Sequence, residues 1–419
     1  MFQGSDFNEG KNYDPLPFDP KELSAVLITH AHLDHVGRLP LLIKGGYTGL
    51  FYATPPTVEL AQLIMEDALE VMEYDHRKFG KPILYEASDI AQVVAQFKPV
   101  DYYKELVLND AKVIFHDAGH IFGSSFIEIQ AGGKKVVFSG DVGNVKAPIV
   151  RDTDSLPANI DALVCESTYG DRLHESTEER QTIIEAMVKE AVARGGVLMI
   201  PSFSLERTQE LIYDLNDLVV RKNKLPTVPI FLDSPLAIGA LHVYRKYHQY
   251  YDEDADRLFK DGDDLFSFPS LTVCKTRDDS KRINQVPAPK IIIAGAGMMN
   301  GGRIVHHALR YLSDAASTLL IIGYQAHGTL GRELLEGKKM VKIMGEKVQV
   351  RCLVKAIGAL SAHGDQNKLL DWIGGGAMTP KKVYLNHGEP EASEALAKRI
   401  ISDLGVKATV VDKGLKVEV

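Results

Sequence analysis

The chain has 419 residues, of which 45% are hydrophobic and 25% are charged, a profile of globular domains that excludes disordered, collagen-like and coiled-coil chains. The length predicts two or three domains. The 48 basic and 56 acidic residues give a net charge of −8, which argues against nonspecific polyanion binding over the whole surface but leaves a local nucleic-acid groove open.

The same composition bears on compartment and partners. The three cysteines are widely spaced and form no CxxC pair, so a reducing, cytoplasmic compartment is predicted. No apolar run approaches a membrane span and the first twenty residues carry no signal-peptide core, so no membrane partner is expected. The sequence leaves open whether the chain acts as a homodimer.

Short β-rich segments with a few helices are predicted for the first part of the chain. Residues 1–20 are predicted to be a loop, and an apolar-faced helix is expected over 57–74. The expected strands are 25–29, 113–115, 126–129, 135–139 and 162–165.

The pattern changes after residue 169 to a regular alternation of strands and helices. Ser176 and Glu179 form a capping-box signature ahead of the first of these helices. Each of four further strands, at 197–200, 229–232, 291–294 and 318–322, precedes a helical pattern. This alternation predicts a parallel sheet with right-handed crossovers, in which ligands bind beyond the carboxyl ends of the strands.

Those strand ends carry small, hydroxyl and glycine residues at 201–204, 233–235, 295–302 and 323–325. Such residues at helix N-termini suit phosphate oxygens, although each loop alone is equally typical of a turn. Because four of them occur together, we expect an anion site. From about residue 350 the pattern is mixed again, which indicates that the βα block is inserted within the first domain.

The densest chemical signal lies directly after the first strand, where His30, His32, Asp34 and His35 fall within six residues. The spacing of His30, His32 and Asp34 lets an extended exit from the strand aim all three to one side. Imidazole with carboxylate suits Zn²⁺, and less often Mn²⁺ or Fe. The alternative is a polar turn whose side chains are hydrogen-bonded and bind no metal, but it explains so dense a motif less well.

Single candidate ligands occur further along the chain at His120, Asp141 and His387. Asp141 and His387 each follow a predicted strand, although each residue alone would more often be structural. Five further histidines are interpreted as surface or helix residues: His116, His174, His306, His307 and His327. His306-His307 lies in a predicted helix and has no ligand spacing.

Taken in order, these motifs resemble two nested families. His30-x-His32-x-Asp34-His35, His120 and Asp141 match the ligand motifs of the metallo-β-lactamase superfamily. The three markers of its β-CASP nucleases are matched by Glu166-Ser167-Thr168-Tyr169-Gly170, Ser361-Ala362-His363 and Asn386-His387-Gly388-Glu389. The chain looks most like the bacterial RNA-processing nucleases similar to the nuclease subunit of the eukaryotic cleavage and polyadenylation machinery. RNase J is similar but usually carries an extra C-terminal domain.

The resemblance implies an α/β fold: an αββα metallo-β-lactamase sandwich over 1–172 and 348–419, with a β-CASP domain containing a parallel sheet inserted over 173–347. Family members open with a glycine-rich hairpin ending in an Asp-Cys-Gly-like motif, and Met1-Phe2-Gln3-Gly4 resembles the residues that follow it. We therefore expect an in-frame strand pair ending in an acidic residue to be encoded upstream of Met1.

The resemblance also implies a catalytic centre with two Zn²⁺ per chain. It assigns His30, His32 and His120 to one zinc and Asp34, His35 and His387 to the other, with Asp141 bridging. A hydroxide activated by both metals would attack phosphorus in line and leave 5′-phosphate and 3′-hydroxyl products. The expected catalytic residues are Asp34, Glu166 and His363: His363 as general acid for the leaving oxygen, Glu166 holding its imidazole.

The implied substrate is single-stranded RNA passing between the domains. Endonucleolytic cutting is expected, and the sequence leaves open additional 5′-to-3′ exonuclease action. Expected RNA contacts are Ser202, Arg207, Ser234, Asn300, Arg303 and Ser361. A DNA nuclease of the same group is the main alternative, but its members commonly carry an aliphatic residue where His387 stands. A non-catalytic scaffold subunit would have lost ligands, and a glyoxalase or lactamase would lack the βα insert.

Overall fold

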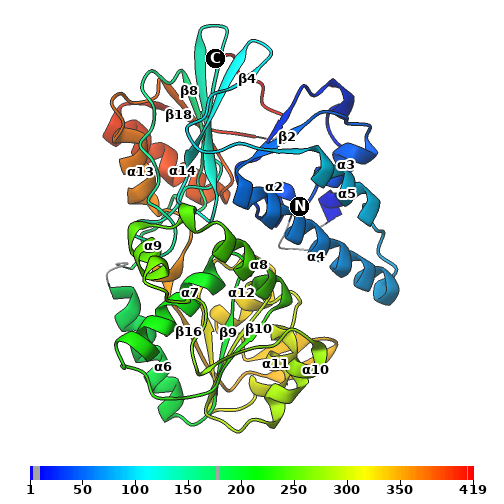
Figure 1. Cartoon of the computed structure of the whole chain (residues 1–419), viewed down its shortest axis with the longest axis vertical. Helices are drawn as coiled ribbons and strands as arrows, with labels where there is room; N and C mark the ends of the chain where they lie inside the picture. Colours follow the sequence, from blue (N-terminus) through cyan, green and yellow to red (C-terminus); the bar gives the residue numbers. More distant parts are fainter. Residues whose placement is uncertain (3–9, 176–178, 413) are drawn as a thin grey trace. The chain divides into compact units, whose positions relative to one another are not determined.

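The computed structural model describes residues 1–2, 10–175, 179–412 and 414–419 (Figure 1). Contacts divide the chain into two compact units. The first unit is Met1 with Tyr13–His174 and Ala362–Val419, and the second is Glu175–Ser361 with the described residues of Phe2–Asn12. The first unit is therefore discontinuous in sequence.

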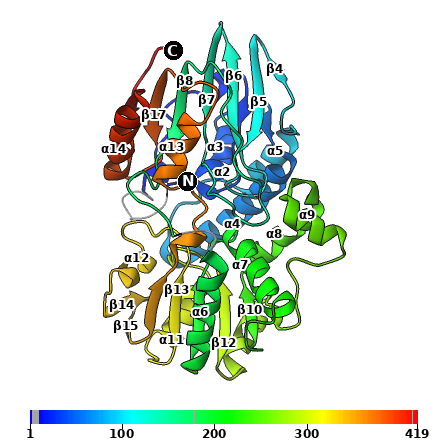
Figure 2. The same ribbon diagram turned by 90° about the vertical axis from the view of Figure 1, so that its left-hand side faces the viewer.

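A seven-stranded sheet forms the larger half of the first unit, in the order β18-β17-β8-β7-β6-β5-β4. Its strands are β4 (Leu106–Leu108), β5 (Ala111–Asp117), β6 (Ser125–Ala131), β7 (Lys134–Phe138), β8 (Ala162–Glu166), β17 (Lys382–Asn386) and β18 (Lys407–Val410). Neighbours from β4 to β7 are antiparallel and those from β7 to β18 are parallel. Helices α13 (Gln366–Gly374) and α14 (Pro390–Arg399) pack on this sheet through Leu369, Ile373 and Leu396 (Figure 2).

A three-stranded parallel sheet makes up the smaller half, with β1 (Val26–Leu27), β2 (Phe51–Ala53) and β3 (Phe97–Pro99). Four helices accompany it: α2 (Leu33–Val36), α3 (Leu39–Lys44), α4 (Pro55–Phe79) and α5 (Ala87–Gln96). The helix expected over 57–74 is longer at both ends. Thr54 caps its start by accepting a hydrogen bond from the Thr57 amide, and Gly80 ends it in a left-handed conformation at φ 68°.

The second unit is built on a six-stranded, wholly parallel sheet in the order β11-β10-β12-β9-β13-β16. The strands are β9 (Val197–Pro201), β10 (Ile230–Asp233), β11 (Leu271–Val273), β12 (Lys290–Ala294), β13 (Thr318–Ile321) and β16 (Leu353–Ala356). The helices are α6 (Arg180–Ala193), α7 (Arg207–Asn216), α8 (Pro235–Lys246), α9 (Glu253–Lys260), α10 (Arg277–Arg282), α11 (Ile304–Tyr311) and α12 (Leu330–Leu335), and β14 (Met340–Ile343) pairs with β15 (Glu346–Gln349) as a hairpin.

The parallel sheet expected from the βα alternation is confirmed, and its four predicted strands are β9, β10, β12 and β13. Residues 348–361, expected in the first domain, lie in the second unit because β16 pairs with β13. Ser176 of the predicted capping box lies outside the described residues, and Glu179 is the N-cap of α6.

Two further expectations concern membranes and cysteines. Across the described ranges, no helix combines the length and the apolar character that crossing a membrane requires. Cys165, Cys274 and Cys352 are buried and free of disulfides. Cys165 is the fourth residue of β8 and contributes to the core of the first unit as a packed thiol.

Candidate metal centre

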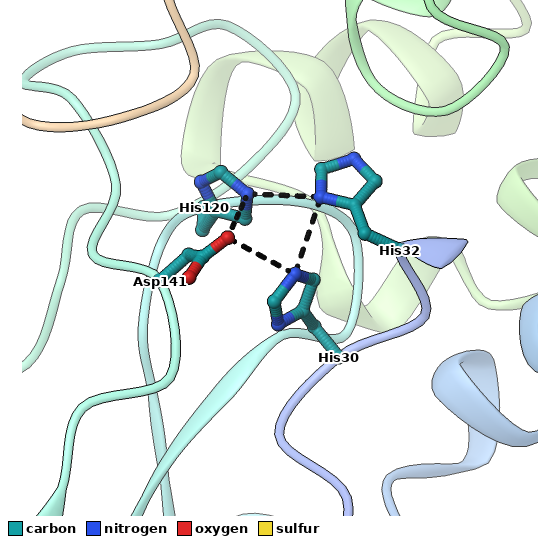
Figure 3. A group of neighbouring side chains, drawn as sticks. All are labelled: His30, His32, His120 and Asp141. Atoms are coloured by element: carbon teal, nitrogen blue, oxygen red, sulfur yellow. Dashed lines mark hydrogen bonds and ion pairs between the residues drawn. The ribbon is translucent and has the colours of Figure 1, made fainter. Parts of the chain in front are cut away.

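Three histidines and one aspartate converge in the first unit, each from a loop that follows a strand (Figure 3). His30 and His32 follow β1, His120 follows β5, and Asp141 follows β7. His32 Nδ1 lies 3.2 Å from both His30 Nε2 and His120 Nε2. Asp141 Oδ2 lies 3.3 Å from His30 Nε2 and 3.5 Å from His120 Nε2. We call His30, His32 and His120 the inner group.

These separations fit a small tetrahedral metal ion. An ion bound about 2.0–2.1 Å from each of four ligands spaces the ligand atoms about 3.3–3.4 Å apart. The four measured pairs span 3.2–3.5 Å. Hydrogen bonding alone explains the cluster poorly, because each neutral imidazole has only one N–H to donate.

A second cluster, the outer group, consists of Asp34, His35 and His387. Asp34 Oδ2 lies 3.1 Å from His387 Nε2 and 3.7 Å from His35 Nε2. Asp141 Oδ1 lies 3.5 Å from His35 Nε2, and both of these atoms are buried without a hydrogen-bond partner among the described residues. The two oxygens of Asp141 thus face different groups, as a carboxylate shared by two ions would.

The inner histidines and His387 differ in the direction in which their pKa values are shifted. Burial, with the neighbouring His30, lowers the pKa of His32 to about 3, and burial is also the main cause of the lowered pKa of His30 and His120. The inner imidazoles are therefore neutral at pH 7, the state that a metal requires. The charge of Asp141 raises the pKa of His387 to about 10, with a further contribution from its hydrogen bond to Asp34.

The extended exit predicted for residues 30–34 is wrong beyond His32. The backbone of His32 is extended, but α2 begins at Leu33, so Asp34 lies in the first helical turn. The turn aims Asp34 away from His30 and His32 and toward His387. A period-two pattern cannot show this change, because it assumes that the strand geometry continues.

Close backbone packing holds the loops that carry His120 and Asp141. A Cβ on Gly143 would lie 1.8 Å from the Gly119 carbonyl oxygen, so only glycine allows this approach. The Gly143 amide also donates to Ala118 O at 2.8 Å. These contacts fix the loop of Asp141 against the loop of His120.

Glu166 and His363 form a hydrogen-bonded pair beside the inner group. His363 Nδ1 lies 3.1 and 3.2 Å from the two oxygens of Glu166, which is completely buried at the end of β8. The Val142 amide donates to Glu166 Oε1 at 2.6 Å and fixes the carboxylate. Burial alone would lower the pKa of His363, but the charge and hydrogen bond of Glu166 outweigh it, so the pKa is raised.

The ring of His363 is 4.5 Å from that of His120, measured between centroids. Next to the outer group, a cavity of about 400 Å³ is lined by Asp141, His35 and His387 together with apolar residues such as Leu27, Ile127 and Phe138. The outer group therefore borders open space.

In the second unit the four predicted strand-end loops meet at one edge of the sheet. Ser204 Oγ lies 3.2 Å from Ser234 Oγ, and a Cβ on Gly295 would lie 3.1 Å from Ser234 Oγ. Ser234 also caps α8 by accepting from the Ala237 amide at 3.3 Å. Ser202 is 1% exposed and accepts from Thr208, whereas Asn300 is exposed. Ser361 is buried at the end of this unit.

The two arginines expected to contact RNA use their donors inside the unit instead. Arg207 is 3% exposed and pairs with Glu210. Arg303 donates to Asp233 Oδ1 at 2.6 Å and to the carbonyls of Cys274 and Lys275. Each guanidinium thus bonds to partners inside the unit, so we assign both to internal structure.

Sequence reasoning missed a buried polar cluster around Asp233. His307, interpreted as an ordinary helix residue, is 3% exposed and hydrogen-bonds Asp233 Oδ2 at 2.7 Å. Ser280 donates to the same oxygen at 2.6 Å. The only sequence signal was an aspartate at a strand end. His116 lies in β5 and is half-buried: it stacks on Phe126 and pairs with Glu128.

The metallo-β-lactamase superfamily domain matches residues 5–165, the Beta-Casp domain matches 208–334, and the Zn-dependent metallo-hydrolase RNA specificity domain matches 347–411. A ribonuclease of Thermus thermophilus is 40% identical over 398 residues, which cover 95% of this chain and 88% of the relative. The chain belongs to the β-CASP family of the metallo-β-lactamase superfamily.

Two further relatives are similar over most of this chain. An RNase J-like protein of Methanocaldococcus jannaschii is 33% identical, with 94% of this chain and 89% of the relative covered. Transcription termination factor FttA of Methanosarcina mazei is 32% identical over 94% of this chain, which spans 63% of that longer protein. The family and enzyme class expected from the motifs, a metal-dependent hydrolase, are thus confirmed.

Proposed function

We propose that the chain is a zinc-dependent ribonuclease that hydrolyses phosphodiester bonds of single-stranded RNA and holds two Zn²⁺. The observation that carries the proposal is the pair of ligand groups sharing Asp141, with the His363–Glu166 pair alongside. The relatives named as a ribonuclease and an RNase J-like protein, and the match to an RNA specificity domain, support RNA as the substrate.

The donor set favours zinc. Three imidazoles and one carboxylate oxygen at tetrahedral spacing form the inner group with Asp141, and a ligand set rich in imidazole suits Zn²⁺ better than Mg²⁺ or Ca²⁺. His387, His35 and Asp34 would hold the second ion, with Asp141 reaching both. Bound there, two such ions would lower the pKa of water and draw charge from the scissile phosphate.

His363 supplies the proton that the departing 3′ oxygen needs. An alkoxide is a poor leaving group near neutral pH, and a protonated imidazole is a suitable donor. Glu166 holds Nδ1, which leaves Nε2 as the atom that delivers the proton. The products are then 5′-phosphate and 3′-hydroxyl ends, from internal cleavage and from exonuclease action in the 5′-to-3′ direction.

The strand-end loops of the second unit are the proposed contacts for RNA phosphates distant from the cleaved bond. Ser234, Ser202, Asn300 and Ser361 would offer hydroxyl and amide donors there. Backbone amides at the N-terminus of α8 add a favourable dipole for an anion. These neutral donors position a strand without reading its base sequence.

Gel analysis of an end-labelled single-stranded RNA beside a DNA of matching sequence tests the substrate. We expect zinc-dependent cutting of RNA with 5′-phosphate products and much weaker cutting of DNA. The His30→Ala variant should lose cutting and zinc, whereas His242→Ala, which removes an exposed imidazole of α8, should keep both.

Two other results would contradict the proposed ribonuclease activity. Preferential cutting of DNA would replace the proposal with a DNA nuclease. RNA binding without cutting, at full zinc content, would favour a scaffold subunit.

A further inference from the structure

Two of the sequence markers meet in the first unit, at the end of the ladder between β8 and β17. The two strands pair in parallel, with Glu166 opposite Asn386. Thr168 and His387, which follow these strands, therefore lie side by side although 219 positions separate them in the chain. Glu166 binds His363, whereas the threonine of the same marker faces a different histidine, the outer ligand His387.

The hydroxyl of Thr168 makes two contacts with His387. Thr168 Oγ1 donates to the carbonyl oxygen of His387 at 3.0 Å and lies 3.2 Å from the ring atom Nδ1. A hydroxyl has one hydrogen to donate, and the carbonyl oxygen takes it, so in the second contact the ring must be the donor. Asp141 Oδ1, 3.5 Å from the same nitrogen, also favours a proton on Nδ1.

This placement of the proton decides which ring nitrogen is available to a metal. An imidazole that carries its proton on Nδ1 has its free lone pair on Nε2, and a metal ion binds the nitrogen with the lone pair. Nε2 of His387 lies 3.1 Å from Asp34 Oδ2, an oxygen of the outer group. The contact with Thr168 therefore leaves the nitrogen beside Asp34 free to bind.

The backbone of His387 is held at the same place. Its φ of 52° lies in the left-handed region, which is uncommon for a residue other than glycine. The Ser167 amide, 3.4 Å from the carbonyl oxygen of His387, donates to it beside the Thr168 hydroxyl. A Cβ on Gly388 would lie 2.5 Å from Ser167 O, so the chain passes close to the end of β8 directly after His387.

We infer that Thr168 is a positioning residue for the outer metal site: its hydroxyl keeps a proton on Nδ1 of His387 and leaves Nε2 for the metal. The inference rests on the proposed function, in which His387 holds the second ion. Thr168 acts through the imidazole and not by contact with the metal. Hydrogen bonds of this kind orient a ligating histidine and set its tautomer, and their loss commonly weakens metal affinity 10–100-fold.

Thr168→Val tests this role, because valine keeps the shape of threonine and lacks the hydroxyl. In competition with a chelator for zinc, Thr168→Val should weaken the outer site roughly 10–100-fold and leave the inner site within about twofold of wild type. Thr168→Ser keeps a hydroxyl, so its outer site should stay within about threefold of wild type. Thermal unfolding of the metal-free variants shows whether each one folds.

Ser167→Ala is the matched control. The Ser167 hydroxyl belongs to the same marker and donates to the carbonyl oxygen of Asn386 at 2.7 Å, so its removal loosens the backbone before His387. This variant should lose thermal stability but keep the affinity of the outer site within about threefold of wild type. An equal loss of affinity in Ser167→Ala and Thr168→Val, or no rescue by Thr168→Ser, would overturn the inference.

Nitrogen-15 magnetic resonance of the histidine side chains in the zinc-loaded protein reads the tautomer directly. The signals of His387 are those that disappear in His387→Ala. We expect a proton on Nδ1 of His387 and zinc on Nε2. Zinc on Nδ1 would show that Thr168 does not set the ligating atom.

The zinc content of His387→Ala separates this inference from the proposed function. If His387→Ala keeps two zinc ions, the proposed outer site is wrong and the role of Thr168 fails with it. If His387→Ala loses one ion but Thr168→Val binds zinc with wild-type affinity, only the role of Thr168 is wrong.

Discussion

The inner and outer ligand groups share Asp141 but differ in burial and in charge. His30 and His120 are at most 1% exposed, whereas Asp34 and His387 are each 34% exposed. The inner imidazoles have lowered pKa values, and the outer His387 has a raised one. The inner group is therefore ready to accept a metal at pH 7, while the outer group must first release a proton.

This contrast teaches how one fold makes two unequal sites from similar residues. Burial removes water from the inner imidazoles and disfavours their charged form. At the outer group, the nearby carboxylates of Asp141 and Asp34 outweigh that cost. We therefore expect two metal sites of different affinity, the inner one tighter.

The largest expected effect comes from Asp141, whose two oxygens face the inner and the outer group. Asp141→Asn removes the charge shared by two ions, so both should be lost and RNA turnover should fall below detection. Elemental analysis of the purified protein, together with the gel assay, measures this. Asp412→Asn, an exposed carboxylate elsewhere, is the control. Retention of two metals by Asp141→Asn would show that the two sites do not depend on a shared carboxylate.

The second effect separates chemistry from metal binding. His363→Ala should lower turnover on RNA by roughly 10²–10⁴-fold, the usual contribution of general acid catalysis, and keep its zinc. A nitrophenyl phosphodiester should restore much of the lost rate, since its leaving group needs no proton. His387→Ala should instead lose about one metal per chain. Zinc loss in His363→Ala would contradict the assignment.

The third effect is the pH dependence of the two affinities. The pKa of His387 is about 10, so below that pH its ring is protonated and metal binding must displace the proton. The affinity of the outer site should therefore rise about tenfold per pH unit from pH 6 to 9, whereas that of the inner site stays nearly flat. Competition with a chelator at several pH values measures both. If the metal affinities of the two sites changed equally with pH, the proposed difference in their protonation would be wrong.

The smallest effect concerns the second unit. Ser234→Ala removes one neutral donor, so RNA affinity should fall less than about tenfold while zinc content stays unchanged. The slope of affinity against salt should match wild type, because no charge is lost. Binding titrations over a salt series test both points. A changed slope would show that the serine variant alters a charged contact.

Much of the fold was predictable because its signals are local. The alternation of apolar strands with amphipathic helices predicted four parallel strands of the second unit. β11 and β16 were missed, since they are the two edge strands of the sheet and lack the fully buried apolar run of the four strands between them. Residues 348–361 were expected in the first domain because β16, which pairs with β13 in the second unit, was not predicted.

The sequence by itself determined which residues could bind metal, because imidazoles and carboxylates at strand ends have few other reasons to be so dense. It also determined the family, whose motifs are specific in type and order. Only the tertiary structure decided the geometry. The turn at Leu33 separates Asp34 from His30, and the two oxygens of Asp141 face opposite groups. Burial of Arg207 converts an apparent phosphate ligand into an internal anchor, because contacts and solvent exposure depend on packing between segments far apart in the chain.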